Sequence, residues 1–241
     1  MKCPIPLYHG TNSFFLPGIK ANGLGAKNPL IEMDTYGCFE ILYKKLEEAY
    51  KELTDPKEKE KWYPAVRMGE AFYKQTVTRG NMNFRHGQTY LTAYKYRAKG
   101  YAQGSEHLRQ LFIINDFLYI EKVLKDYKEV ISQFQLINDY WNKPVTPVVV
   151  TVKKNILDDN SLNTESGDPS TPDIKLITER LEEHKEWEKI PILRREVERI
   201  SEPTVPQRIT FELTDIVDSK NLEFEVFSKE SFKIEDTITA K

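Results

Sequence analysis

The chain has 241 residues, of which 39% are hydrophobic and 30% are charged, and its formal net charge is -2. The hydrophobic fraction is sufficient for a packed core, and the small net charge excludes a strong overall attraction to nucleic acid or to membrane surfaces. No run approaches the roughly 18 apolar residues of a membrane span, and the N-terminus lacks the apolar core of a signal peptide. Cys3 and Cys38 form no metal-binding or disulfide pattern, so we expect a soluble cytoplasmic protein with two packed thiols.

The stretch at residues 5–9 predicts a strand that leads into His9-Gly10-Thr11. Glycine lets a ligand approach the backbone closely, and its N–H and C=O can pair with an amide. A neutral histidine beside it adds one donor and one acceptor. Because packing alone does not explain the pair, we interpret it as part of a site for a flat carboxamide and a sugar hydroxyl. The alternative is a strand end that turns into a loop.

Capping signals and apolar spacing predict helices in the first third of the chain. Pro17 suits the first turn of a helix over residues 16–24, and Gly23 suits its C-terminal end. Ile19 and Leu24 are expected to face the core. Helical spacing also predicts helices over residues 38–52 and 56–78, within a helical insert at about residues 31–78.

The segment at residues 79–89 predicts a loop that contains Arg85 and His86. The loop is rich in side chains that bind anions or stack, since it holds two arginines, one histidine and one phenylalanine. The next segment, residues 89–92, is β-prone and predicts a short strand.

A helix is predicted directly afterwards, over residues 95–103. It carries the small residues Ala98, Gly100 and Ala102, which would let the helix lie close to a neighbouring element. A longer helical region is predicted at about residues 106–140, with one or two breaks.

Strands are predicted again toward the C-terminus. Residues 148–152 are a short β-branched run that follows Pro144 and Pro147, and residues 222–227 alternate strictly, as in a half-exposed strand. Residues 161–172 are rich in Ser, Gly and Pro and predict a mobile loop. The other predicted elements are a helix over residues 174–189 and strands over 203–205 and 208–213. Strands at both ends with helices between them indicate an α+β fold in one domain.

Two tyrosines are candidates for binding a ring. Tyr90 lies on a predicted strand, and Tyr101 follows it on the next predicted helix. Side chains in these positions can face one cleft, where stacking and cation–π attraction on a flat cationic ring contribute roughly 0.5–2 kcal/mol. The alternative is that both are core aromatics, since the chain contains 13 tyrosines.

These motifs carry a family resemblance. The sequence YHGT at residues 8–11, then NGL, then GQTYLTAYKYRAKGYA at residues 87–102, resembles the ADP-ribosyltransferases of the diphtheria-toxin-like and poly-ADP-ribose-polymerase-like type, with their His-Tyr-Glu residues. The resemblance implies an α+β, ADP-ribosyltransferase-like split β-sheet core with helical insertions, in a single domain over residues 1–241. The matching segments are residues 5–25, 84–104, 145–157 and 200–217.

The resemblance also implies roles for individual residues in binding NAD. His9 would bond a ribose hydroxyl, and the backbone of Gly10 would hold the nicotinamide carboxamide, with Thr11 completing the motif. Tyr90 and Tyr101 would flank the nicotinamide ring. The diphosphate would be contacted by Arg85, since an arginine fork suits a phosphate, and His86 is a weaker candidate for the same contact.

The resemblance places the catalytic carboxylate at Glu202, which would act together with His9 and Tyr90. Such a carboxylate would bond the 2′-hydroxyl of the nicotinamide ribose and stabilise the positive charge that grows as nicotinamide leaves. It could also act as general base toward the acceptor. Pro203 directly follows and departs from the pattern, because proline removes a backbone donor at a strand start. The competing carboxylates are Glu196, Glu198 and Glu212.

The implied function is that of an NAD-dependent mono-ADP-ribosyltransferase, a bacterial or phage toxin, effector or defence enzyme. NAD is its substrate and no metal is implied; the acceptor would be a protein, DNA or RNA. A toxin would have an antitoxin as a further partner, and no membrane partner is expected. The protein would act in the cytoplasm, or in that of a target cell.

RNA 2′-phosphotransferases also use NAD, but rely on an Arg-rich set that we do not find. The alternative from another class is a non-catalytic nucleotide- or partner-binding module on the same fold.

Overall fold

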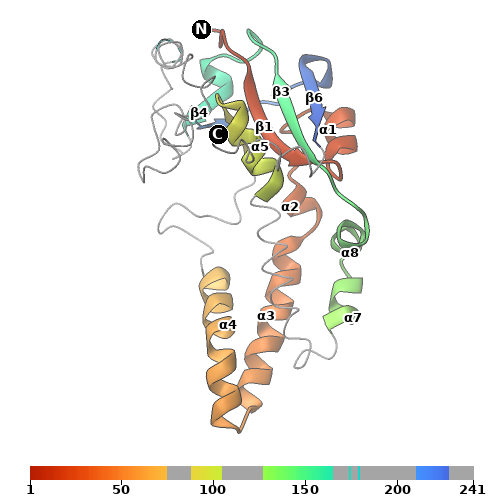
Figure 1. Cartoon of the computed structure of the whole chain (residues 1–241), viewed down its shortest axis with the longest axis vertical. Helices are drawn as coiled ribbons and strands as arrows, with labels where there is room; N and C mark the ends of the chain where they lie inside the picture. Colours follow the sequence, from red (N-terminus) through yellow and green to blue (C-terminus); the bar gives the residue numbers. More distant parts are fainter. Residues whose placement is uncertain (75–87, 105–126, 165–173, 175–178, 180–209, 228–241) are drawn as a thin grey trace, which may run out of the picture. The chain divides into compact units, whose positions relative to one another are not determined.

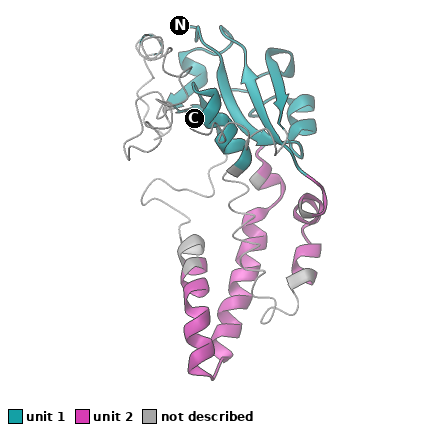
Figure 2. Cartoon of the chain, viewed as in Figure 1, with its two compact units in different colours: residues 1–27, 88–105, 145–241 teal, residues 28–87, 106–144 magenta. Residues whose placement is uncertain are grey.

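The structure is a computed structural model of the chain, and it divides into two compact units (Figures 1 and 2). Unit 1 consists of residues 1–27, 88–105 and 145–241, and unit 2 consists of residues 28–87 and 106–144. The residues described here are 1–74, 88–104, 127–164, 174, 179 and 210–227. The helical segments predicted at about 31–78 and 106–140 fall in unit 2.

Unit 1 is built on a six-stranded antiparallel sheet with the strand order β4-β5-β2-β1-β3-β6. The strands are β1 (Leu7–Asn12), β2 (Thr89–Thr92), β3 (Pro147–Val152), β4 (Leu162–Thr164), β5 (Thr210–Leu213) and β6 (Leu222–Val226). Together with the helices, this sheet confirms the predicted α+β class.

β1 lies in the middle of the sheet, between β2 and β3. It pairs with β3 over six registers, from Leu7 opposite Val152 to Asn12 opposite Pro147. The predicted strand at residues 5–9 is therefore wrong at both ends. The strand continues through Gly10 because β3 supplies backbone partners along its whole length. Gly10 thus lies inside a strand, and the interpretation of a strand end is wrong.

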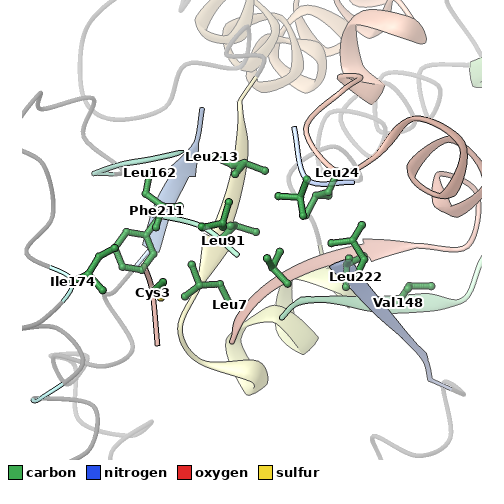
Figure 3. Close-up of a cluster of buried hydrophobic side chains, with 14 residues drawn as sticks. Cys3, Leu7, Leu24, Leu91, Val148, Leu162, Ile174, Phe211, Leu213 and Leu222 are labelled. Carbon is green, nitrogen blue, oxygen red and sulfur yellow. The ribbon is translucent and has the colours of Figure 1, made fainter. Parts of the chain in front are cut away.

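One face of the sheet carries the main hydrophobic core, to which all six strands contribute (Figure 3). Fully burying a leucine stabilises the fold by about 1.5–3 kcal/mol. The strand residues in this core are Leu7, Leu91, Val148, Val150, Val152, Leu162, Phe211, Leu213 and Leu222. Since side chains alternate along a strand, their intervening neighbours point to the opposite face.

The first helix, α1 (Leu16–Asn22), confirms the predicted helix over residues 16–24. Pro17 lies in its first turn, where no helical N–H partner is lost. Gly23 ends it with a φ of 91°, and its N–H donates to the carbonyl of Ile19 at 2.9 Å. As predicted, Leu24 is buried in the core, and Ile19 packs against that core.

The helix after β2, α5 (Lys95–Gly104), lies on the face of the sheet opposite the main core. Its residue Ala98 is fully buried and packs with Val149 and Phe227 in a second, smaller cluster. Two single-turn helices complete the described elements of unit 1. They are η1 (Asp159–Ser161) and η3 (Ser219–Asn221).

Unit 2 is helical in its described residues. Its helices are α2 (Pro29–Glu32), α3 (Thr35–Glu52), α4 (Pro56–Lys74), α7 (Tyr127–Ser132) and α8 (Gln135–Asn142). The first of the two long helices is capped by Asp34, which accepts a hydrogen bond from the Gly37 N–H at 3.1 Å. Before α4, Asp55 accepts one from the Lys57 N–H at 2.9 Å. No helix within the described ranges has both the length and the apolar character to cross a membrane.

The predicted loop over residues 161–172 is wrong at its start, because Leu162–Thr164 forms β4. Pairing with β5 and full burial of Leu162 stabilise a strand that local composition does not indicate. The strand predicted over 203–205 lies outside the described residues. The helix predicted over 174–189 lies outside them too, except for residues 174 and 179.

Candidate functional site

The hydrogen bonds at the end of β1 establish which way each of its peptide groups faces. The Ser13 N–H donates to the Thr146 carbonyl at 2.8 Å, in the same register that joins β1 to β3. Because backbone groups alternate in direction along a strand, His9 and the other odd-numbered residues bond to β3. Tyr8 and Gly10 therefore direct their N–H and C=O toward β2.

On the β2 side, the ladder stops before it reaches Gly10. Tyr8 is in register with Thr92, and the next pair would be Gly10 and Tyr90, but the ladder does not continue to these two described residues. Instead, the Tyr90 carbonyl lies 2.9 Å from Nδ1 of His9. The N–H and C=O of Gly10 thus face β2 at the point where the ladder ends. A carboxamide pairs with one donor and one acceptor of this kind.

The bond to Tyr90 also defines the chemistry of the His9 ring. A carbonyl only accepts hydrogen bonds, so Nδ1 carries the proton and Nε2 of the neutral ring is an acceptor. Burial lowers the pKa of His9 below its ordinary value of 6.5, and the bond to the carbonyl opposes this to a smaller extent. The ring is therefore neutral at pH 7, with an acceptor nitrogen at its far side.

The face of Gly10 that would carry a side chain is covered by α5. A Cβ atom there would lie 2.1 Å from the Ala98 carbonyl oxygen, 2.6 Å from the Ala102 nitrogen and 2.8 Å from Tyr101 Cβ. Packing therefore does explain the glycine, contrary to the interpretation from sequence. The prediction that small residues let this helix approach a neighbour is confirmed for Ala98 and Ala102, whereas Gly100 would have open space for a Cβ.

The Cβ atom of Tyr101 is one of the atoms next to Gly10, and the residue is 37% exposed. Arg97, one turn earlier on α5, donates from Nε to the Tyr101 hydroxyl at 2.7 Å. Its guanidinium carbon also lies 5.3 Å from the centre of the phenol ring. The ring is thus held by a cation on one side and starts directly against Gly10.

Next to Tyr90, on β5, lies Glu212. The two residues are in register, and since Tyr90 directs its backbone toward β1, they form a pair without mutual backbone hydrogen bonds. Side chains in such a pair are close, with Cβ atoms about 4.5–5.5 Å apart. Asn163 of β4 is in turn opposite Glu212. The structure therefore aligns Gly10, Tyr90, Glu212 and Asn163 in one row on one face of the sheet.

Two predicted site residues point the other way. His9 and Thr11 alternate with Gly10, so their side chains leave β1 on the face of the main core. His9 is half-buried and reaches the edge of β2 through its ring, whereas Thr11 is 1% exposed. The structure therefore brings His9 to the backbone of Tyr90 but does not bring Thr11 to the row.

No family model, curated protein or solved structure matches the chain. Among the described residues, no group of three or more His, Cys, Asp and Glu side chains could hold a metal ion.

Several predicted site residues lie outside the described residues. These are Arg85 and His86, the predicted catalytic residue Glu202, and its competitors Glu196 and Glu198.

Glu212 is the competing carboxylate whose neighbours the structure describes. The sequence signal for it is the alternation within Thr210-Phe211-Glu212-Leu213, which leaves one charged residue on the face opposite two core residues.

Proposed function

We propose that this chain is an NAD-dependent mono-ADP-ribosyltransferase, built on the ADP-ribosyltransferase-like core that its sequence resembles. The observation that carries the proposal is the backbone of Gly10, which faces β2 where the ladder stops. Around it stand two tyrosines and a carboxylate, namely Tyr90, Tyr101 and Glu212. This is the set of groups needed to hold a flat cationic amide and to stabilise a growing positive charge.

In the proposed complex, the nicotinamide carboxamide pairs with Gly10. Its NH₂ donates to the Gly10 carbonyl and its oxygen accepts from the Gly10 N–H. The pyridinium ring lies between Tyr90 and Tyr101, where each aromatic face contributes roughly 0.5–2 kcal/mol. The hydrogen bond from Arg97 holds the Tyr101 ring in place for this contact.

The rest of NAD would contact His9, which the structure describes, and Arg85, which lies outside the described residues. The acceptor nitrogen Nε2 of His9 suits the O–H of a ribose hydroxyl, as the sequence resemblance implies. A contact between Arg85 and the diphosphate stays a prediction, because residue 85 lies outside the described residues.

The reaction breaks the bond between C1′ of the ribose and the pyridine nitrogen, and the electron pair leaves with neutral nicotinamide. The ribose carries the positive charge until an acceptor oxygen or nitrogen bonds to C1′ and releases its proton. We assign Glu212, the neighbour of Tyr90, to stabilise this charge and to receive the proton. Glu202, the carboxylate favoured by the sequence resemblance, lies outside the described residues and stays the competing prediction.

The acceptor is proposed to be a macromolecule, as in toxins, effectors and defence enzymes of this kind. Incubation of whole lysate with the protein and NAD labelled on the adenosine part should yield a labelled product. Separate treatment with protease, DNase and RNase then identifies a protein, DNA or RNA acceptor by which enzyme removes the label.

Release of nicotinamide from NAD tests the activity and the carboxylate together. We expect the Glu212→Gln variant to release nicotinamide about 100-fold more slowly or worse, the scale of losing one electrostatic group at a reacting centre. The matched control is Glu225→Gln on β6, which lies on the same face but is paired with Lys95. Glu202→Gln is measured beside them.

Three outcomes are informative. Loss only in Glu212→Gln supports the assignment, and loss only in Glu202→Gln restores the sequence prediction. NAD binding with no nicotinamide release by the unaltered protein would instead favour the binding module.

A further inference from the structure

His9 makes a contact that a ribose-binding role does not require. Its Nδ1 donates to the Tyr90 carbonyl at 2.9 Å. This carbonyl is the group that Gly10 would bond if the β1–β2 ladder continued past Tyr8 and Thr92. The ladder stops at the residue where the imidazole takes over the carbonyl.

Within the described residues, both strands are otherwise regular where they separate. Gly10 has no side chain to hold β2 away, and it is fully in register with β3 on its other side. Tyr90 is in register with β5, so β2 is regular at that residue too. Among the described residues, the bond from the His9 imidazole to the Tyr90 carbonyl is a departure from an ordinary ladder at this position.

We propose that His9 is a positioning residue that keeps the β1–β2 ladder from closing over Gly10 by occupying the Tyr90 carbonyl. The Gly10 N–H and C=O are thereby left for a ligand with a carboxamide. The statement about the ladder is independent of any reaction, whereas the statement about the carboxamide rests on the proposed function. The groups that would bind the ligand are thus backbone atoms of Gly10, and the group that positions them is the His9 side chain.

Amide hydrogen exchange in the unaltered full chain tests the first statement. The Gly10 amide should exchange at least tenfold faster than the amide of Tyr8, which is in the β2 ladder, and that of Thr11, which faces β3. If the Gly10 amide is as slow as both neighbours, it is hydrogen-bonded and the proposal is overturned.

Two variants of equal size test the role of His9 itself. In asparagine, the amide nitrogen is as many bonds from the backbone as Nδ1, so His9→Asn should keep the donor and the fast exchange at Gly10. His9→Leu has a similar shape without a donor, and we expect the ladder to close and Gly10 exchange to slow at least tenfold. Equal exchange in the two variants would refute the proposal. The Thr11 amide reports whether each variant is folded, and if His9→Leu is not, the comparison within the unaltered chain decides.

Saturating NAD separates this proposal from the proposed function. If both hold, NAD slows Gly10 exchange in the unaltered protein and has less effect in His9→Leu. If NAD changes nothing while the two variants differ as expected, the positioning role stands and the proposed function fails.

Discussion

The packing of α5 on Gly10 leads to a prediction with a definite magnitude. In Gly10→Ala, the new methyl group would lie 2.1 Å from the Ala98 carbonyl oxygen. To restore an ordinary contact of 3.4 Å, the helix would have to withdraw by about 1.3 Å. The other close atoms are the Ala102 nitrogen and Tyr101 Cβ, and neither can rotate away.

Overpacking of a buried site typically costs 1–3 kcal/mol. Because backbone atoms provide the two closest contacts, we expect a loss at the upper end, about 3 kcal/mol. Withdrawal of α5 would also move Tyr101 from Gly10, so nicotinamide release should fall as well. Urea unfolding followed by circular dichroism measures the stability, and the assay of nicotinamide release measures the function.

The matched control is on the same helix. A Cβ at Gly100 would meet nothing within 4 Å. Gly100→Ala should therefore stabilise the protein by about 0.5–1 kcal/mol, as alanine does in a helix interior. The reasoning would be refuted if Gly10→Ala unfolded at the same urea concentration as the unaltered protein, or if both alanine variants lost stability equally.

Three further predictions follow from the site and the core. Because burial lowers the pKa of His9 below 6.5, the unfolded chain binds the proton first as pH falls, and the free energy of unfolding should drop as pH is lowered from 6.5 toward the pKa of the folded state. The His9→Asn variant should lack this pH-dependent loss of stability, and an equal pH dependence in both proteins would contradict the buried neutral ring. Tyr101→Leu should weaken NAD binding about fivefold, the scale of one cation–π contact, and calorimetry should find no change for Tyr63→Leu, whose ring is 52% exposed in unit 2. Burial, with a smaller effect from Asp34, raises the pKa of the Cys38 thiol to about 12. A thiol reagent should therefore label Cys38 at pH 8 only after urea is added, and rapid labelling of Cys38 in the native protein would refute its burial.

Local signals in the sequence were sufficient for elements whose ends are capped. The helix at Leu16–Asn22 could be predicted because Pro17 and Gly23 act on their own neighbours in the chain. The run Val148–Val152 could be predicted because its composition allows little other than a buried strand. The small residues of α5 indicated a close neighbour, but not that this neighbour is Gly10.

What could not be predicted depends on register between distant strands. Tyr90 and Glu212 are neighbours because β2 pairs with β5, and no local pattern identifies that partner among four nearby glutamates. The strand at Leu162–Thr164 exists because β5 pairs with it, although its sequence is typical of a loop. The role of packing at Gly10 was likewise hidden until the position of α5 was known.

In the proposed complex, the Gly10 backbone holds a carboxamide through one donor and one acceptor. Calorimetric titration with NAD and with nicotinic acid adenine dinucleotide tests it, because the second compound replaces the carboxamide by a carboxylate that cannot donate to the Gly10 carbonyl. We predict that NAD binds at least tenfold more tightly than the acid. Equal affinity for the two compounds, or tighter binding of the acid, would contradict a carboxamide contact at Gly10.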